Sequence, residues 1–447
     1  MSAIDRYITP DELIWVYRSI QFREALLARE WGETLVAGHP GVITTWLGAL
    51  GVSSQLIIDQ TVHDSYNWIL HLAWLTPDNM LAFKNLSIFL GSGRMLIATV
   101  ISVGIVGVYF LSRQLIGSCL ALLLALLLAI DPFYAGLGGL LHVDGLVSTF
   151  VILSLLSLAL AAGYGEKIIS ERLRMLYAAL SGGTAALAVL SKSPALLLLP
   201  TAMLVLLLMF WTSRNVPLVQ RAGKIFLAGI IWAGCFLIVA ILLYPALWSS
   251  PLNVISFAGG NAGRHVAEAL RPTFFLGQVA FDHGAAFYPI AVAWRIGPAV
   301  TIGLTALLVL ALSRENRKTL PLRTLFVFAL WTVIFMGLIT ITTKKFDRYA
   351  LPVIPALMVL AVIGLGSWLR KGNRWGGILL AAVLILQILY TLFVWPFPLS
   401  AYNLLLGGPY TAQKVMPLGW GESISSAGTW LTGEENVEKK AAVSGIA

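Results

Sequence analysis

Long apolar runs separated by short polar segments follow one another from about residue 86 to residue 395. Each run holds about 17 residues or more, which is the length that a helix needs to cross the hydrocarbon core of a membrane. Ten such runs lie near residues 86–111, 115–131, 143–163, 174–192, 194–212, 225–244, 288–312, 324–342, 349–369 and 375–395. The pattern predicts an all-α polytopic membrane protein with about ten transmembrane helices.

The first 85 residues contain no run of that length, so we expect them to lie outside the membrane or in its interface. From Leu13 to Ala28, apolar positions interleave with polar and charged ones, which predicts a helix with one face in lipid. Asp11 and Glu12 are placed at its start, where acidic residues are favoured by the helix dipole. Residues 42–52 are apolar but too short to cross, which predicts a second interfacial helix.

Composition excludes a soluble globular protein, because 58% of the residues are hydrophobic and only 11% are charged. The two cysteines, Cys119 and Cys235, lie inside apolar runs and indicate neither a disulfide framework nor a metal site. The net charge of +9 would suggest a nucleic-acid partner in a soluble protein. Here the basic residues gather in alternate loops between spans, so we expect a membrane partner and no nucleic acid.

The basic loops predict the orientation of the chain in the membrane. By the positive-inside rule, the loops rich in lysine and arginine face the cytoplasm. The remaining segments then face outside, in a multi-pass protein of the cell membrane. They are residues 1–85, the tail 396–447 and, within a transmembrane domain of residues 86–395, the turn 131–142, the break 191–194, the loop 245–287 and the turn 344–348. The cytoplasmic set consists of Arg113, Lys167, Arg172, Arg174, Arg214, Arg221, Lys224, Arg314, Arg317, Lys318, Arg323, Arg370, Lys371 and Arg374.

The segments assigned to the outside also contain ionisable residues of both signs next to the apolar spans. Such groups are retained near a membrane where they pair, face water or function. Carboxylates beside cations at the lipid interface suit a reaction whose substrate carries a phosphate in the headgroup layer and whose nucleophile must lose a proton. The candidates are Asp11, Glu12, His39, Arg94, His142, Asp144, Lys192, Lys344, Lys345 and Arg348.

Several of these residues have a structural interpretation beside the functional one. Arg94 either holds an anionic donor or extends its charge to the interface and pairs with a carboxylate. Lys192 is either a phosphate ligand or a lysine at the end of a helix. The turn with Lys344, Lys345 and Arg348 lies on the side where positive charge is disfavoured, which favours function. His142 and Asp144 form either a metal pair or a hydrogen-bonded turn, so metal dependence stays open.

Five stretches in this order resemble one enzyme family. They are "PDE" at residues 10–12, "HPG" at residues 39–41, "GSGRMLIATV" around Arg94, "SKSP" around Lys192 and "KKFDRYALP" with Lys344. Together with the tail "YNLLLGGPYTAQKVMPLGWGES", they resemble polyprenyl-phosphate-sugar-dependent glycosyltransferases of the GT-C class. The closest likeness is to glycosyltransferase family 39, the protein O-mannosyltransferase and aminoarabinose transferase superfamily.

The resemblance implies a GT-C-like fold and assigns roles to the candidate residues. Asp11 matches the general base that deprotonates an acceptor hydroxyl for an inverting displacement, with Glu12 as its partner. Arg94 matches the arginine that binds the donor phosphate, and Lys192, Lys344, Lys345 and Arg348 complete that site. His39, His142 and Asp144 are placed at the acceptor side or at a second acidic site. Family members carry a transmembrane helix before the acidic loop, so the chain is expected to lack the first one.

The expected function is therefore transfer of mannose or a related hexose from a polyprenyl-phosphate donor. No cofactor is firmly implied. The acceptor is left open among a protein, a glycolipid and a polysaccharide. The alternative is a multi-span transporter or flippase of lipid-linked or anionic solutes. The charges gather at one predicted face, next to a long interfacial region, which favours the enzyme. A non-catalytic lipid-binding member is a third possibility.

Overall fold

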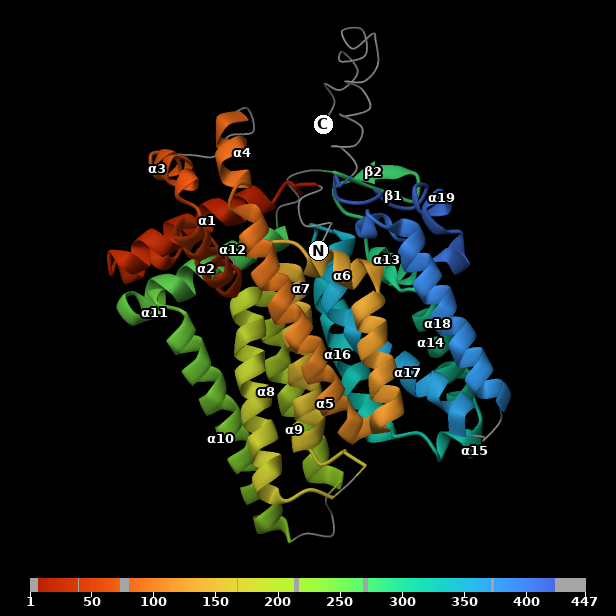
Figure 1. Cartoon of the computed structure of the whole chain (residues 1–447). Coiled ribbons are helices and arrows are strands. Elements are labelled where there is room, and N and C mark those ends of the chain that lie inside the picture. Colours follow the sequence, from red (N-terminus) through yellow and green to blue (C-terminus); the bar gives the residue numbers. More distant parts are fainter. Residues whose placement is uncertain are drawn as a thin grey trace.

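The computed structural model describes residues 7–38, 40–72, 80–166, 168–212, 217–267, 272–370 and 374–422, and these residues are mostly helical. Within them, eight helices are long and apolar enough to cross a membrane, or up to ten if two sharply bent helix pairs each count as one span. Figure 1 shows these helices side by side in a bundle, with shorter elements gathered at one end. The predicted all-α membrane fold is confirmed.

The first long element, α5 (Leu90–Ile130), is two antiparallel helices rather than one. As a straight helix it would be about 60 Å long, twice the thickness of a hydrocarbon core. Gly117 breaks it with φ 77° and ψ 164°, a conformation that residues with a Cβ rarely adopt. Arg94 near its start and Leu141 just beyond its end both contact the Glu12 carboxylate. The chain therefore turns back at Gly117, as the two predicted spans at 86–111 and 115–131 require.

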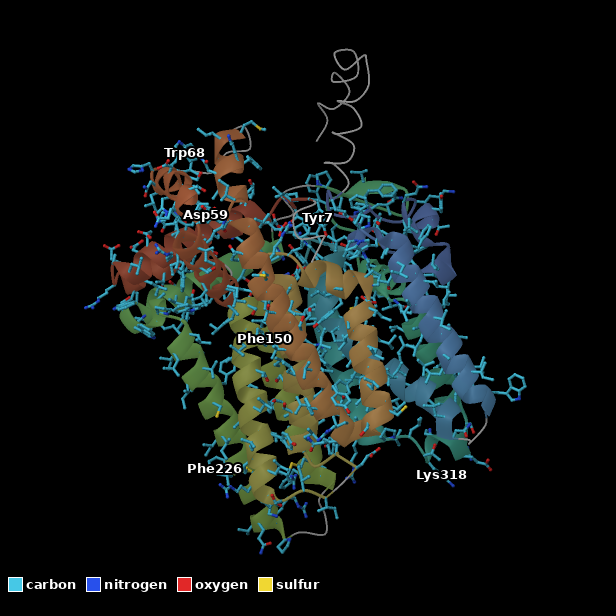
Figure 2. The ribbon with its side chains drawn as sticks, in the orientation of Figure 1. Tyr7, Asp59, Trp68, Phe150, Phe226 and Lys318 are labelled. Carbon is cyan, nitrogen blue, oxygen red and sulfur yellow. The ribbon has the colours of Figure 1, made fainter. Side chains whose placement is uncertain are left out.

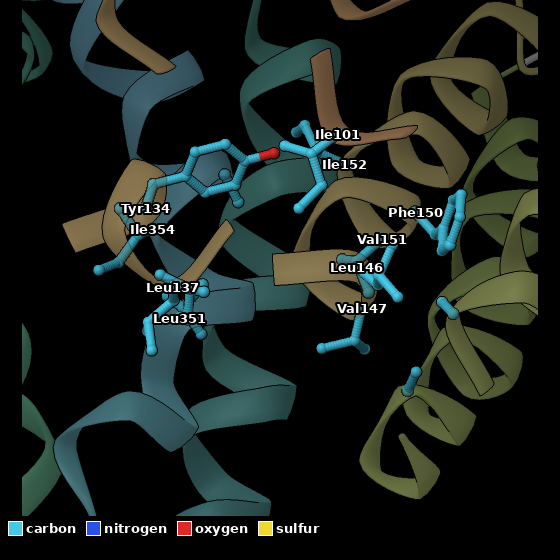
Figure 3. Packing of buried hydrophobic residues seen from close by; sticks show 14 of the residues in the cluster. Ile101, Tyr134, Leu137, Leu146, Val147, Phe150, Val151, Ile152, Leu351 and Ile354 are labelled. Carbon is cyan, nitrogen blue, oxygen red and sulfur yellow. The ribbon is translucent and has the colours of Figure 1, made fainter. Parts of the chain in front are cut away.

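The centre of the bundle is formed by α7 (Val143–Ala161) and α17 (Ile354–Arg370). Their spanning windows are 94% and 89% buried, which suits sequences that are apolar all round. Figure 3 shows Leu146, Val147 and Phe150 of α7 in this core. The helices around this centre are α8 (Glu171–Ser191), α9 (Leu198–Thr212), α10 (Leu218–Leu243), α14 (Pro298–Leu312), α16 (Leu322–Ile341) and α18 (Arg374–Val394).

Glycine allows two of these helices to approach closely. A Cβ built on Gly364 of α17 would lie 2.1 Å from the Gly303 carbonyl oxygen of α14, and one on Gly303 would lie 2.5 Å from the Ala361 oxygen. No larger side chain fits without separating the helices. Such contacts are a common way to pack helices in lipid, where apolar burial does not favour helix association.

One predicted span differs from expectation. The segment 288–312 is not a single straight helix but α13 (Phe287–Arg295) followed by α14, bent by 115°. Pro298 lacks an N–H group and restricts Gly297, so the helix cannot continue through this point. As a result, Arg295 lies at the end of α13, where it contacts Asp347 and Leu399, instead of inside a straight span.

The N-terminal region packs as a layer of helices on one end of the bundle. Its first helix, α1, begins at Glu12 as predicted and ends at Leu27. The apolar side chains of α1 are largely buried, and the helix packs most extensively against α2. The second predicted helix extends to Ile58 and then bends by 115°. The layer contains α1 (Glu12–Leu27), η1 (Trp31–Thr34), α2 (Val42–Ile58), η2 (Gln60–Val62), α3 (His63–Leu70) and α4 (Met80–Ser87).

The remaining short elements lie at the two ends of the bundle. Figure 1 places α6, α12, the β-hairpin, α13 and α19 at the end that carries α1, and α15 at the opposite end, where Figure 2 labels Lys318. In the hairpin, Thr273 pairs with Ala280. The bounds are α6 (Pro132–Gly138), η3 (Ser193–Leu197), α11 (Ala246–Ser249), α12 (Pro251–Ala267), β1 (Thr273–Phe275), β2 (Gln278–Ala280), α15 (Arg314–Arg317), η4 (Asp347–Val353), η5 (Pro398–Ser400), η6 (Leu404–Leu406) and α19 (Gly408–Ala412).

Candidate active site

Asp11 lies where α1 meets the bundle. It occupies the cap position of α1, but its side chain makes no capping hydrogen bond. Instead, Oδ2 accepts a hydrogen bond of 3.1 Å from Nη2 of Arg348 and lies 3.7 Å from Nε2 of His142. Burial raises the pKa of Asp11, but His142 and Arg348 outweigh that effect and lower the pKa to about 2. At neutral pH the group is an ionised carboxylate, and its side chain is still 38% exposed.

His142 joins Asp11 to a buried ion pair. Its Nδ1 lies 3.2 Å from Oδ2 of Asp144, and it accepts a long hydrogen bond of 3.4 Å from the Asp144 backbone N–H. Asp144 is fully buried, and its Oδ1 accepts a hydrogen bond of 2.6 Å from Nζ of Lys192. Asp11, His142, Asp144 and Lys192 therefore form a continuous polar chain. The pair at 142 and 144 has the geometry of a hydrogen-bonded helix start.

The described part of the chain contains no group of three or more His, Cys, Asp or Glu side chains placed to hold a metal ion. Asp11, His142 and Asp144 are close in sequence or space, but their contacts are to one another and to cations.

Lys192 reaches the site because the chain breaks its helical path there. α8 ends at Ser191, Lys192 is extended with φ −156° and ψ 130°, and η3 begins at Ser193 with Pro194 as its second residue. Pro194 disfavours the helical conformation for the residues before it. The Lys192 ammonium group lies 4.2 Å from the centre of the Tyr349 ring. Besides its bond to Asp144, it has further donor capacity toward the cavity, since an ammonium group carries three N–H donors.

The turn after α16 supplies the second group of cations. Arg348 stacks on Trp420, with its guanidinium carbon 3.7 Å from a ring centre, and two of its buried nitrogens, Nε and Nη1, have no hydrogen-bond partner within the described chain. The Lys344 backbone oxygen accepts a hydrogen bond from Thr342, but its side-chain ammonium makes neither a hydrogen bond nor an ion pair with any described residue and lies 5.6 Å from the centre of the Phe346 ring. Burial lowers the pKa of Lys344, and the charge of Arg348 lowers it further. Unsatisfied cationic donors of this kind attract an anion.

Lys345 has a different environment from the one predicted. Its side chain is almost fully buried, and Nζ donates to the backbone oxygens of Thr340 and Thr342 at 2.8 and 2.6 Å. It also lies 3.2 Å from the Asp282 carboxylate. The ammonium group holds the turn together and does not line the main cavity, so the geometry does not support the predicted phosphate contact.

Arg94 and Glu12 form an ion pair inside the protein. Arg94 Nε and Nη2 donate to the two carboxylate oxygens of Glu12 at 2.7 and 2.5 Å, and Glu12 also accepts hydrogen bonds from Thr9 and the Leu141 backbone N–H. The side chains are 2% and 0% exposed. Of the two interpretations of Arg94, the structure shows pairing with a carboxylate. Asp11 and Glu12, adjacent in sequence, point to different places.

One cavity of about 490 Å³ connects the exposed end of this site with the bundle. Its polar part is lined by Asp11, His142 and four cations of the described chain: Arg18, Lys192, Lys344 and Arg348. Its other walls are apolar and come from α7, η3, α16 and η4. They include Val147, Leu196, Leu197, Phe335, Leu338, Ile339 and Pro352. The cavity therefore combines a cationic end with a hydrocarbon-like end.

Some site residues were not predicted, and one predicted residue cannot be placed. Arg18 follows Asp11 by seven residues, so helical periodicity would have put both on one face. Trp420 and Tyr349 lie in two of the stretches that carry the family resemblance, but neither was singled out as a site residue. Arg295 was also not predicted as a site residue. It pairs with Asp347 at 2.5 Å and donates to the backbone oxygen of Leu399, which fixes the C-terminal segment beside the site. His39 lies outside the described residues.

Comparison with known proteins confirms the resemblance. Residues 80–248 match the family model described as dolichyl-phosphate-mannose-protein mannosyltransferase. This region includes Arg94, His142, Asp144 and Lys192 but neither Asp11 nor the turn at Lys344. No curated protein matches the sequence.

Solved structures with a similar fold come from a bacterium and an archaeon. ArnT from Cupriavidus metallidurans bound to undecaprenyl phosphate is 15% identical with a TM-score of 0.57, over 85% of this chain and 61% of that one. The apo oligosaccharyltransferase of Archaeoglobus fulgidus is 15% identical with a TM-score of 0.51, over 98% and 56%. The chain thus spans about three fifths of the length of these proteins. At this identity the likeness shows a GT-C glycosyltransferase fold.

Proposed function

We propose that the protein transfers a sugar, mannose or a related hexose, from a polyprenyl-phosphate donor to an acceptor hydroxyl with inversion at the anomeric carbon. The observation that carries this proposal is the amphipathic cavity, in which an ionised, accessible carboxylate and four cations share one lining with apolar side chains. A transferase of this kind needs those three elements within reach of one another.

The donor phosphate is assigned to the cationic end of the cavity. Lys344 and the Arg348 nitrogens without a partner among the described residues are the principal ligands, and Lys192 assists. The isoprenoid chain lies along the apolar wall toward the bundle. Two of the solved structures with this fold were determined with a polyprenyl carrier, undecaprenyl phosphate in one and dolichol-phosphate in the other, which supports this class of donor.

The reaction proceeds in one displacement. The acceptor oxygen forms a bond to the anomeric carbon, and the bond from that carbon to the phosphate oxygen breaks. The acceptor proton passes to Asp11, and the electron pair of the broken bond leaves with the phosphate, where Lys344 and Arg348 stabilise the charge. A carboxylate with a pKa near 2 is a weak base, so it accepts the proton late, when the hydroxyl has become acidic by bond formation.

The remaining proposals concern the regions of the chain and the side of the membrane on which each lies. Residues 1–85 form the catalytic region, residues 86–395 the transmembrane domain and residues 396–447 a tail on the same side. The lysine- and arginine-rich loops at the opposite end of the bundle support an active site that faces outside the cytoplasm, in the cell membrane, by the positive-inside rule. The acceptor is a hydroxyl of a protein, a glycolipid or a polysaccharide.

Replacing Lys344 by Gln should raise the Kd for undecaprenyl phosphate about tenfold, because one charge-assisted contact to the phosphate is lost. The Lys344 side chain makes no hydrogen bond or ion pair with a described residue, so the fold should persist. The measurement is binding of undecaprenyl phosphate to the purified protein in detergent. Lys318→Gln, at the other end of the bundle, is the matched control. Equal affinities of the two variants for undecaprenyl phosphate would show that the donor phosphate does not bind at this end of the cavity.

A further inference from the structure

Arg18 is a cation of the cavity to which the donor site gives no role. It lies on α1, seven residues after Asp11, so about two helical turns separate the residues along one face. It lines the same cavity as Asp11 and is half-buried. Among the described residues it has no hydrogen-bond or ion-pair partner, and its guanidinium carbon lies 4.9 Å from the centre of the Trp15 ring.

A half-buried guanidinium without an acceptor is an unusual arrangement. Arginine stays charged in proteins, and its five N–H donors match the oxygens of a carboxylate or phosphate in pairs. Burial lowers the pKa of Arg18, and the nearby charge of Asp11 acts in the opposite direction. The Trp15 ring, itself almost fully buried, holds the group in place. The guanidinium is thus positioned before any ligand binds.

Arg18 is distinct from the cations assigned to the donor phosphate. Along α1, seven residues at about 1.5 Å each place Arg18 about 10 Å beyond Asp11 on the helix axis. Arg348 contacts Asp11 directly at 3.1 Å, whereas Arg18 forms no ion pair with any described residue. Arg18 therefore adds positive charge to the cavity apart from the contact between Arg348 and Asp11.

We infer that the acceptor is anionic: it carries a phosphate or carboxylate group that pairs with Arg18 while its hydroxyl reaches Asp11. This inference rests on the proposed function and narrows its acceptor. A neutral serine or threonine peptide would leave the guanidinium without an acceptor in a partly desolvated site, which is unfavourable. An anion at Arg18 also occupies the positive region that the donor phosphate does not use.

The test measures binding of small sugars to protein already saturated with undecaprenyl phosphate. The probes are glucose 6-phosphate, glucuronate and neutral glucose, and binding is followed by isothermal titration. Both anionic sugars should bind more tightly than glucose, and the tighter of the two identifies phosphate or carboxylate as the preferred group. Arg18→Gln should raise the Kd of the anionic sugars about tenfold. Arg18→Lys, which keeps the charge, should restore part of the affinity, and Arg29→Gln at the exposed end of α1 should change nothing.

Three results would overturn the inference. They are equal binding of glucose and glucose 6-phosphate, unchanged affinity in Arg18→Gln, and a loss of undecaprenyl phosphate binding in Arg18→Gln that matches the loss of anionic sugar, which would make Arg18 a donor ligand. Failure of the proposed function gives a different result, because the wild-type protein would then not bind undecaprenyl phosphate at all. Melting temperatures of Arg18→Gln and Arg18→Lys close to that of the wild type show that the compared proteins are folded.

Discussion

Asp11→Asn should lower sugar transfer by about 10²- to 10⁴-fold, the range that a positioned general base contributes. Asparagine has the shape of aspartate and keeps an oxygen toward Arg348, but it cannot take the proton of the acceptor. Affinity for undecaprenyl phosphate should change little, because the proposed phosphate ligands remain. The measurement is the rate of hexose transfer from a polyprenyl-phosphate hexose by purified protein at saturating donor.

The matched control is Asp64→Asn, an exposed carboxylate on α3 of the same layer. The pKa of Asp11 is depressed in the folded protein, so its charge stabilises the fold above the ordinary pKa near 3.8, and that contribution is lost as pH falls through about 2. Asp11→Asn should therefore be less stable than the wild type at neutral pH. For this reason the assays should be run well below the melting temperature of the variant. Unchanged turnover in Asp11→Asn would remove Asp11 from the mechanism.

Glu12→Gln should act on stability rather than on chemistry. Removing one partner of a buried ion pair typically costs about 3–5 kcal/mol, because the other charge stays buried without compensation. Here Arg94 would lose its carboxylate, and the junction of α1 with the chain around Leu141 would lose an acceptor. The measurement is thermal or denaturant unfolding in detergent, with the exposed Glu33→Gln as control.

The expected result also separates the two acidic residues by role. Glu12→Gln should lower the folded fraction, while the protein that remains folded keeps its donor affinity. If Glu12→Gln instead melts like the wild type and loses transfer, Glu12 is a catalytic partner of Asp11, as the sequence suggested, and the structural role is wrong.

Hydropathy predicted most of the architecture because each span must bury its own backbone hydrogen bonds and present apolar side chains to lipid. That constraint is local, so the spans around Gly117 and the break at Lys192 could be located from sequence. The bend before Pro298 could not be placed with the same rule, since its apolar run continues through the break. The burial of α1 against α2 depends on contacts between segments, which periodicity does not reveal.

The candidate site was predicted in part for a similar reason. Charge near an apolar span marks Arg94, Lys192 and Lys345 equally, but only tertiary contacts decide which of them face a cavity. Arg94 and Lys345 have protein partners that occupy their donors, and Lys192 keeps part of its own free for the cavity. Trp420 reaches Arg348 across 72 residues of sequence, a contact that no local pattern contains.

The lipid that co-purifies with the wild-type protein tests the central claim most directly. Mass spectrometry of the gently solubilised protein should find a polyprenyl phosphate bound to it, free or joined to a hexose-sized sugar. Such a lipid would fix the class of donor and, if the sugar is retained, its mass. A protein that carries only membrane phospholipids, and that moves an anionic solute into proteoliposomes without chemical change, would contradict the proposed transferase and favour a transporter.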